Sequence, residues 1–210
     1  MDIGRSFSFV FEDEEWIKKI LLAAVASIIP VVGQFMVLGW SLDIARRVIN
    51  NDPAPLTNPF DDFGGYLMLG LKAMVIGLVY SLPLLIFVLP GSIIGANAES
   101  ENVALALSVC VGCFSLIYGI LLALAMPAAY GILAATDNLG QALNPGKIIE
   151  VFRGAPAAYL ITILGIIIAG FIAGLGSIAC GVGVLATGAY ANAMMGHLYG
   201  QAYKQSTGVI

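Results

Sequence analysis

The chain has 210 residues, of which 60% are hydrophobic and only 10% are charged, and its mean hydropathy is +0.95. Soluble domains usually carry about 25% charged residues, so water could not solvate the surface of this chain, and lipid must cover much of it. The formal net charge of −4 argues against a nucleic-acid-binding protein, because such proteins need clustered basic side chains.

The first 15 residues predict an amino terminus that is not a secretory signal. A signal peptide begins with basic residues before an apolar run, whereas residues 12–15 are Glu-Asp-Glu-Glu. We therefore expect an unprocessed chain whose first membrane helices serve as its targeting signal. Aromatic rings favour the headgroup layer, so this region predicts a short stretch on the cytoplasmic interface, marked by Phe7, Phe9, Phe11 and Trp16.

Six apolar segments come near the roughly 20 residues that a membrane-spanning helix needs. They form three pairs: residues 16–29 with 34–48, 65–89 with 103–135, and 157–177 with 182–203. Pro30 and Gly33 mark the turn of the first pair, and Cys180 and Gly181 mark that of the third. The sequence therefore predicts an all-α polytopic membrane helix bundle. It forms a single integral membrane domain over residues 1–210, with about six transmembrane helices in three hairpins.

The first hairpin has two alternatives that charge does not separate. Its leading arm of 14 residues would be about 21 Å long, against an apolar bilayer core of about 30 Å. The hairpin therefore either crosses the membrane or is re-entrant, and both return the chain to the same face. A third alternative, one kinked helix over residues 16–48, would place Lys18 and Lys19 opposite Arg46 and Arg47.

Bends and interfacial helices are predicted elsewhere. Pro83 and Pro127 each remove a backbone hydrogen bond inside an apolar segment, and Pro127 is the expected bend in residues 103–135. Residues 145–153 predict a short amphipathic helix on the cytoplasmic side, with Ile148, Ile149 and Phe152 on its apolar face.

The distribution of charge predicts the topology. In the hairpin arrangement all nine Lys and Arg residues lie on one face, and the loop over residues 90–102 on the other face carries Glu99 and Glu101 without a base. Basic residues stay on the cytoplasmic side of membranes, so both termini are expected in the cytoplasm.

Several motifs resemble a known family. They are residues 1–16, then Ile29-Pro30-Val31-Val32-Gly33, Ala45-Arg46-Arg47-Val48-Ile49 and Asp61-Asp62-Phe63-Gly64. Together they resemble the uncharacterised bacterial and archaeal membrane family called domain of unknown function 4013. The resemblance implies the plasma membrane of a bacterium or archaeon, and it brings no activity, substrate or catalytic residue.

We expect no catalytic, cofactor-binding or metal-binding residue. Cys110 and Cys113 have a Cys-x-x-Cys spacing, but no His or basic neighbour would stabilise a thiolate, so packing is the favoured interpretation. His197, the single histidine, is either a ligand-contacting or proton-accepting group inside the bundle or an imidazole at the membrane interface.

Charged and small residues have further interpretations. Asp43 precedes Arg46 and Arg47 by three and four residues, which favours pairing along one helix face, and Lys72 is expected to snorkel. Small-residue stripes favour close helix packing within the bundle or against another membrane protein. These stripes are Gly170 with Gly174, Gly196 with Gly200, and Gly165 with Ala169 and Ala173.

Two classes of function fit these features. The first is a non-enzymatic integral membrane protein, an accessory or scaffold subunit that packs against lipids, another membrane protein or a second copy of itself. The alternative is a small transporter or channel for an apolar or amphipathic solute. A transporter needs a midplane cavity beside broken helices, at Pro30, Pro83, Pro127 or Gly181. An enzyme is not expected, because no nucleophile pairs with a base.

Overall fold

The computed structural model describes residues 1–178 and 182–208, and their regular structure is entirely helical. The longer helices are α2 (Trp16–Ser27), α3 (Val32–Ile49), α4 (Phe63–Ala96), α5 (Glu101–Thr136), α7 (Pro145–Gly154), α8 (Pro156–Leu175) and α9 (Val182–Thr207). The short ones are α1 (Ile3–Ser8), the 3-10 helix η1 (Phe9–Glu12), α6 (Leu139–Ala142) and the 3-10 helix η2 (Gly176–Ile178). The all-α prediction is confirmed for this part of the chain.

Polar side chains begin several of these helices. Asp62 caps α4 by accepting a hydrogen bond from the backbone N–H of Gly65. Asn144 caps α7 in the same way, and Pro145 follows at the first helical position, where its missing N–H costs nothing. The predicted amphipathic helix over residues 145–153 is thus confirmed as α7. Of its predicted apolar face Ile148 is buried, whereas Ile149 is exposed and Val151 is buried in its place.

The first hairpin is confirmed as two helices, α2 and α3, and the single kinked helix over residues 16–48 is wrong. The chain turns between Ser27 and Val32, and Val31 adopts a positive φ of 64° there. Gly33 lies so close to the carbonyl of Ala26 that no larger residue would fit. The predicted turn of the third hairpin, at Cys180 and Gly181, lies outside the described residues.

α3 is the centre of the molecule. It packs along α4 on one side and along α9 on the other, and it also contacts α2 and α5. Trp40 of α3 is fully buried, and its indole N–H donates to the carbonyl of Thr57 at 2.9 Å. This bond ties the irregular segment between α3 and α4 to the core.

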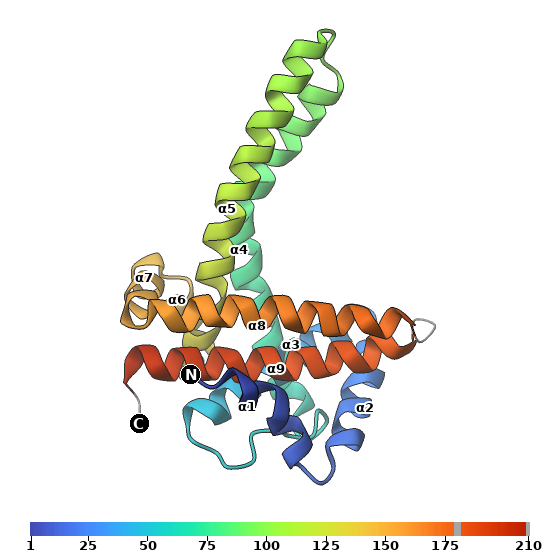
Figure 1. The fold of residues 1–210 in the computed structure, drawn as a ribbon, viewed down its shortest axis with the longest axis vertical. Coiled ribbons are helices and arrows are strands. Elements are labelled where there is room, and N and C mark those ends of the chain that lie inside the picture. The colour runs from blue at the N-terminus through green and yellow to red at the C-terminus, as the bar shows by residue number, and fades with distance from the viewer. Residues whose placement is uncertain (179–181, 209–210) are drawn as a thin grey trace.

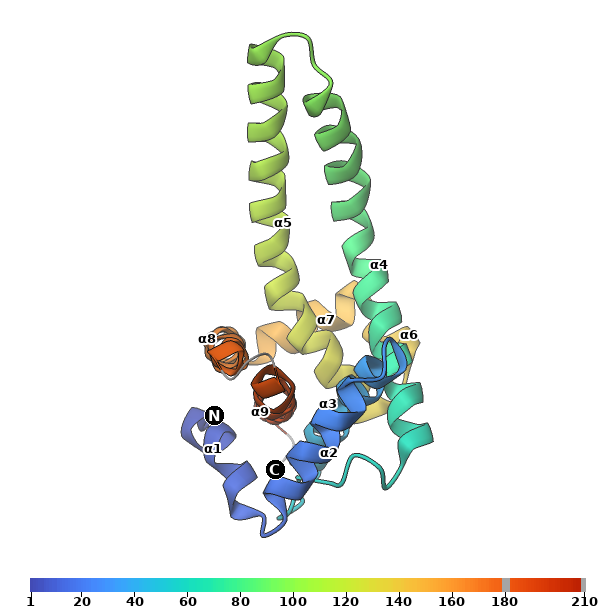
Figure 2. The same ribbon diagram turned by 90° about the vertical axis from the view of Figure 1, so that its right-hand side faces the viewer.

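Figures 1 and 2 show two directions of helix packing. The α4–α5 hairpin projects upward from a layer formed by the other helices, whereas α8 and α9 run side by side across it. In Figure 2 α8 and α9 are seen almost end-on while α4 and α5 stand upright. Helices crossing in this way cannot all span one flat membrane along its normal. The predicted bundle of six transmembrane helices is therefore not confirmed.

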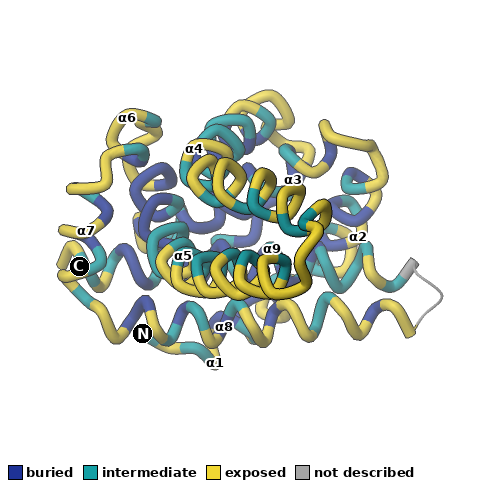
Figure 3. The backbone as a smooth tube through the Cα atoms, turned by 90° about the horizontal axis from the view of Figure 1, so that it is seen from above, coloured by how far each residue is buried: buried dark blue, intermediate teal, exposed yellow. Residues whose placement is uncertain are grey.

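Three helical stretches in the described part of the chain are long and apolar enough to cross a membrane: Phe63–Ala96, Glu101–Thr136 and Pro156–Ile178. The upper turns of α4 and α5 are mostly exposed, as the colours of Figure 3 show. α4 continues through Pro83 and Pro90, so the loop at its end is shorter than the predicted residues 90–102. Pro127 likewise lies inside a continuous α5. Apolar helices tolerate such prolines because local adjustments satisfy the freed carbonyls.

Candidate functional site

A polar cavity of about 740 Å³ lies between α1, α9 and the segment that follows α3. Its lining includes Arg5 from α1, His197 and Lys204 from α9, and Asn51 and Asp52 from the segment after α3. Figures 1 and 2 place α1 and that segment on the side of α9 away from the tip of the α4–α5 hairpin. The cavity is therefore assembled by the packing of segments from both ends of the chain.

His197 is buried in the wall of this cavity, with only 4% of its surface exposed. Its ring stacks on Phe9, with the ring centroids 4.4 Å apart. Its Nδ1 lies 3.0 Å from Ser6 Oγ and 3.0 Å from Gln201 Nε2. The sequence left open a histidine inside the bundle or one at the membrane interface. The structure instead places it under the amino-terminal helix α1.

The hydrogen bonds around Gln201 determine the tautomer of His197. The backbone N–H of Asp2 donates at 2.7 Å, so the Gln201 atom that it meets must be the oxygen Oε1. The other amide atom is then the NH₂ group, which only donates, and it lies near Nδ1 of His197 as well as near Asp2 O and Ser6 Oγ. This contact favours the tautomer in which Nδ1 accepts and the proton of the neutral ring is on Nε2. No described residue is hydrogen-bonded to Nε2.

Burial and the nearby Arg5 guanidinium lower the pKa of His197 from 6.5 to about 4, against a smaller opposite effect of Asp2. The hydrogen bonds of Nδ1 also lower the pKa of His197. Protonation would turn Nδ1 from an acceptor into a donor that faces the Gln201 NH₂ group, which is itself a donor. His197 is therefore a neutral hydrogen-bond donor near pH 7.

Acidification is expected to destabilise the protein through His197. The pKa of His197 is about 4 in the folded chain, whereas an ordinary histidine, as in the unfolded chain, has a pKa of 6.5. As the pH falls, the unfolded chain therefore takes up the proton first. The stabilisation is complete above about pH 6.5 and is lost as the pH falls toward 4, with about 2 kcal/mol gone at pH 5. Unfolding of the detergent-solubilised protein at pH 7.5 and pH 5 measures this loss. His197→Asn keeps an acceptor for Gln201 but cannot titrate, so an equal loss in this variant would contradict the assignment.

Charged residues form a second cluster at the base of the α4–α5 hairpin. Lys72 of α4 donates to the Asp137 carboxylate at 2.8 Å, and Nε of Arg46 donates to the carbonyl of Ala134 at 2.9 Å. Lys72 thus joins α4 to the end of α5. The predicted pairing with Asp43 holds for Arg47, at 3.0 Å, whereas Arg46 points to α5.

The predicted small-residue stripes separate into two kinds. A Cβ on Gly196 would overlap the carbonyl of Ser41, and one on Gly200 would come too close to the carbonyl of Ala45, so the stripe of Gly196 and Gly200 brings α9 against α3. Gly170 and Gly174 on α8 have open space beside them. Packing within the chain is therefore confirmed for the first stripe, and the second remains exposed.

The two cysteines of the Cys-x-x-Cys spacing are free and lie exposed on α5. A group of three or more His, Cys, Asp or Glu side chains that could hold a metal ion is absent from the residues that the structure describes. Packing between helices does not account for this pair, since both cysteines lie on the outer surface of the hairpin.

Sequence reasoning missed most of the cavity. Ser6 and Gln201 are 195 residues apart in the sequence, and only the packing of α1 on α9 brings them together. The spacing of His197 and Gln201 by one helical turn was the only local signal, and it predicts a shared face without saying what covers that face.

These features define the class of the protein: its described residues form an all-helical structure with several apolar helices long enough to span a membrane. A family model described as protein of unknown function (DUF4013) matches residues 22–182, so the chain belongs to that family. Comparisons with curated proteins and with solved structures give no match.

Proposed function

We propose that this chain is a non-enzymatic membrane scaffold or accessory subunit. In this proposal the α4–α5 hairpin crosses the bilayer, and the other helices form a layer at its cytoplasmic face. The exposed apolar surfaces of the hairpin and of α8 then contact lipids and a partner membrane protein. The rest of the proposal depends on one observation, which is the apolar outer surface of the α4–α5 hairpin.

The lengths of the hairpin helices support the crossing. No charged residue lies between Lys72 and Glu99 on the way up, or between Glu101 and Asp137 on the way down. Each stretch is longer than the roughly 30 Å of a bilayer core at 1.5 Å per residue. Side chains such as Ile86, at 70% exposed, and Leu116, at 67% exposed, face outward. A water-soluble monomer rarely exposes so large an apolar patch.

The base of the hairpin supports contact with lipid. An apolar groove of about 380 Å³ lies there between α5 and α7, lined by residues that include Leu121, Ile148 and Phe152. Such a groove suits an acyl chain. Lys147 and Arg153 on the amphipathic α7 supply the positive charge that favours anionic headgroups.

The outer face of α8 supports contact with a partner helix. Leu164, Phe171 and Leu175 are exposed there, and the open Gly170 and Gly174 lie on the same helix. Small residues let a second helix approach closely, where dispersion contacts hold it.

The scaffold proposal is favoured over a transporter by the position of the polar cavity. A transporter binds its solute near the midplane, between helices that are broken there. In this chain α4 and α5 are continuous through Pro83, Pro90 and Pro127, and the polar cavity lies in the layer beside His197.

Cysteine labelling in sealed vesicles tests the topology. With the native cysteines replaced by alanine, single cysteines at Ser100 and Ser206 are expected to react from opposite faces. Ser177, in η2, separates the alternatives: six crossing helices would place it with Ser100, whereas a two-helix crossing leaves it on the Ser206 side. Labelling of Ser177 together with Ser100 would contradict the proposed layer.

The mass of the intact complex, extracted gently from native membranes, tests the scaffold role. The chain alone has a mass of 21.9 kDa, and we expect the complex to be heavier than one chain with its bound lipid. Gly170→Ile with Gly174→Ile should return the mass to that of the lone chain. Gly64→Ile is the matched control, because Gly64 is also open but lies at the start of α4, away from the α8 surface. A lone native monomer would count against the proposal.

A further inference from the structure

We propose that the cavity between α1, α9 and the segment after α3 binds a small soluble molecule carrying a phosphate group, held by Arg5, Lys204 and the Nε2–H of His197. This inference adds a ligand to the layer and does not depend on the partner surfaces proposed above. Its starting point is a set of three hydrogen-bond donors from two helices at one cavity.

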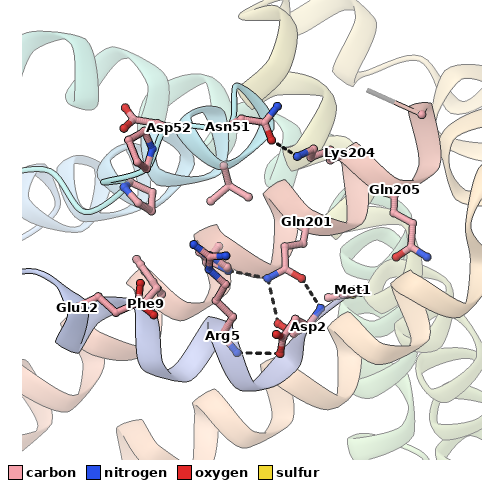
Figure 4. Close-up of a pocket in the computed structure, with 15 residues that line it drawn as sticks. Met1, Asp2, Arg5, Phe9, Glu12, Asn51, Asp52, Gln201, Lys204 and Gln205 are labelled. Carbon is pink, nitrogen blue, oxygen red and sulfur yellow. Dashed lines mark hydrogen bonds between the residues drawn. The ribbon is translucent and has the colours of Figure 1, made fainter. Parts of the chain in front are cut away.

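Two of these donors carry positive charge that the described residues leave uncompensated. The guanidinium of Arg5 makes no ion pair with them, and the ammonium of Lys204 donates to the neutral amide oxygen of Asn51. Figure 4 shows the side chain of Arg5 extending from α1 across the cavity. An anion would supply the missing negative charge.

The acidic residues of the lining form no ion pair with Arg5 or Lys204 in the described part of the chain. Asp52 is paired with Arg47 at 2.9 Å, so its charge is already offset. The carboxylate of Asp2 accepts the backbone N–H of Arg5 at 3.0 Å and caps α1. Glu12 lies beyond Phe9, at the far end of the cavity from Lys204 (Figure 4).

His197 adds a donor whose polarity is fixed. Gln201 holds Nδ1 as the acceptor, which leaves the proton on Nε2, and the ring lines the cavity. Its Nε2 makes no hydrogen bond to the described residues, and this atom is not among the fully buried polar atoms that lack a partner. An acceptor in the cavity would take the place of water at this atom.

Phosphate fits this set better than a smaller anion. Its several oxygens can accept two parallel bonds from a guanidinium together with single bonds from an ammonium and an imidazole N–H. The cavity of about 740 Å³ is larger than phosphate alone, and Phe9, Val48, Pro53 and Pro55 give it an apolar wall. The geometry therefore suits a phosphate ester with an organic group.

The position of the cavity favours a soluble source over a lipid headgroup. α1 and the segment after α3 lie on the side of α9 away from the tip of the α4–α5 hairpin (Figures 1 and 2). In the proposed topology this side faces the cytoplasm, so a lipid in the bilayer would have to leave its leaflet to enter.

The single histidine provides a direct test with the full chain in detergent. Inorganic phosphate and phenyl phosphate are titrated at constant ionic strength, and the imidazole signals of His197 are followed by NMR. We expect a saturable shift of the Nε2 signal, with phenyl phosphate binding more tightly than phosphate. Chloride should leave the signal in place. If neither phosphate shifted the histidine signal, the proposal would be overturned, and this result needs no variant.

Variants then assign the contacts. Arg5→Gln and Lys204→Gln should each weaken phenyl phosphate binding by about tenfold, the expected loss of a charge-assisted hydrogen bond. Lys18→Gln, which removes an exposed lysine on α2 outside the cavity, should bind as the native chain does. Unchanged affinity in the Arg5 variant would refute the site. In the last arm, vesicles containing phosphatidic acid are compared with phenyl phosphate as protectants of Arg5 against chemical modification. If the vesicles protect Arg5 and phenyl phosphate does not, the ligand is a lipid headgroup and the proposal of a soluble ligand is overturned.

Discussion

Replacing Gly39 by alanine is expected to separate α3 from α4 and to destabilise the protein by about 3 kcal/mol or more. A Cβ at this position would overlap the backbone carbonyl of Tyr66, and a backbone group cannot rotate away as a side-chain end can. Gly70 makes the reciprocal approach to the carbonyl of Phe35. Alanine gains at most about 1 kcal/mol of helix propensity over glycine, so the steric cost prevails.

Gly119→Ala is the matched control for this substitution. Gly119 lies inside α5, and a Cβ there would meet open space, so only the small gain in helix propensity remains. Thermal unfolding in one detergent should therefore show a large loss for the Gly39 variant and none for the Gly119 variant. Equal stability of the two variants would mean that α3 and α4 are not in such close contact.

The class of the fold was predictable because it depends on local composition. Long stretches without charge require helices in an apolar environment, and the amphipathic pattern of residues 145–153 predicted α7. The pairing of Arg47 with Asp43 followed from helical spacing alone. These features are set by residues within one or two turns of one another.

The direction of α8 and α9 was not predictable from hydropathy. An apolar side chain gives the same signal whether protein or lipid covers it, so the fully buried Tyr159 and the exposed Phe171 contribute alike to the pattern of α8. Which surface a helix faces depends on its partners. For α9 those partners include α8 and, from the opposite end of the chain, α3 and α1.

The cavity could not be found from the sequence for a similar reason. The bond between Asp2 and Gln201 joins residues that are 199 positions apart, and no spacing rule connects them. The environment of His197 changes from an expected membrane surface to a closed wall only because α1 folds back over α9. A polar residue on an apolar helix identifies a position that needs a partner, and the fold determines which partner it receives.

Introducing arginine on the outside of the hairpin is expected to prevent its membrane insertion. Ile86 and Leu116 are among its most exposed side chains, at 70% and 67%. An arginine near the bilayer centre costs about 2.5–3.5 kcal/mol on insertion scales, so the double variant Ile86→Arg with Leu116→Arg loses about 5–7 kcal/mol. That loss is large enough to move most of the protein out of the membrane-integrated fraction.

Resistance to alkaline extraction from membranes measures this fraction. Phe60→Arg is the control, because Phe60 is also an exposed apolar side chain, at 42%, but lies before α4, on the cytoplasmic side of the proposed layer. It should remain integrated, since a cation there stays in water. If the double hairpin variant were extracted no more readily than the Phe60 variant, α4 and α5 would not cross the lipid, and α8 would become the helix that anchors the protein.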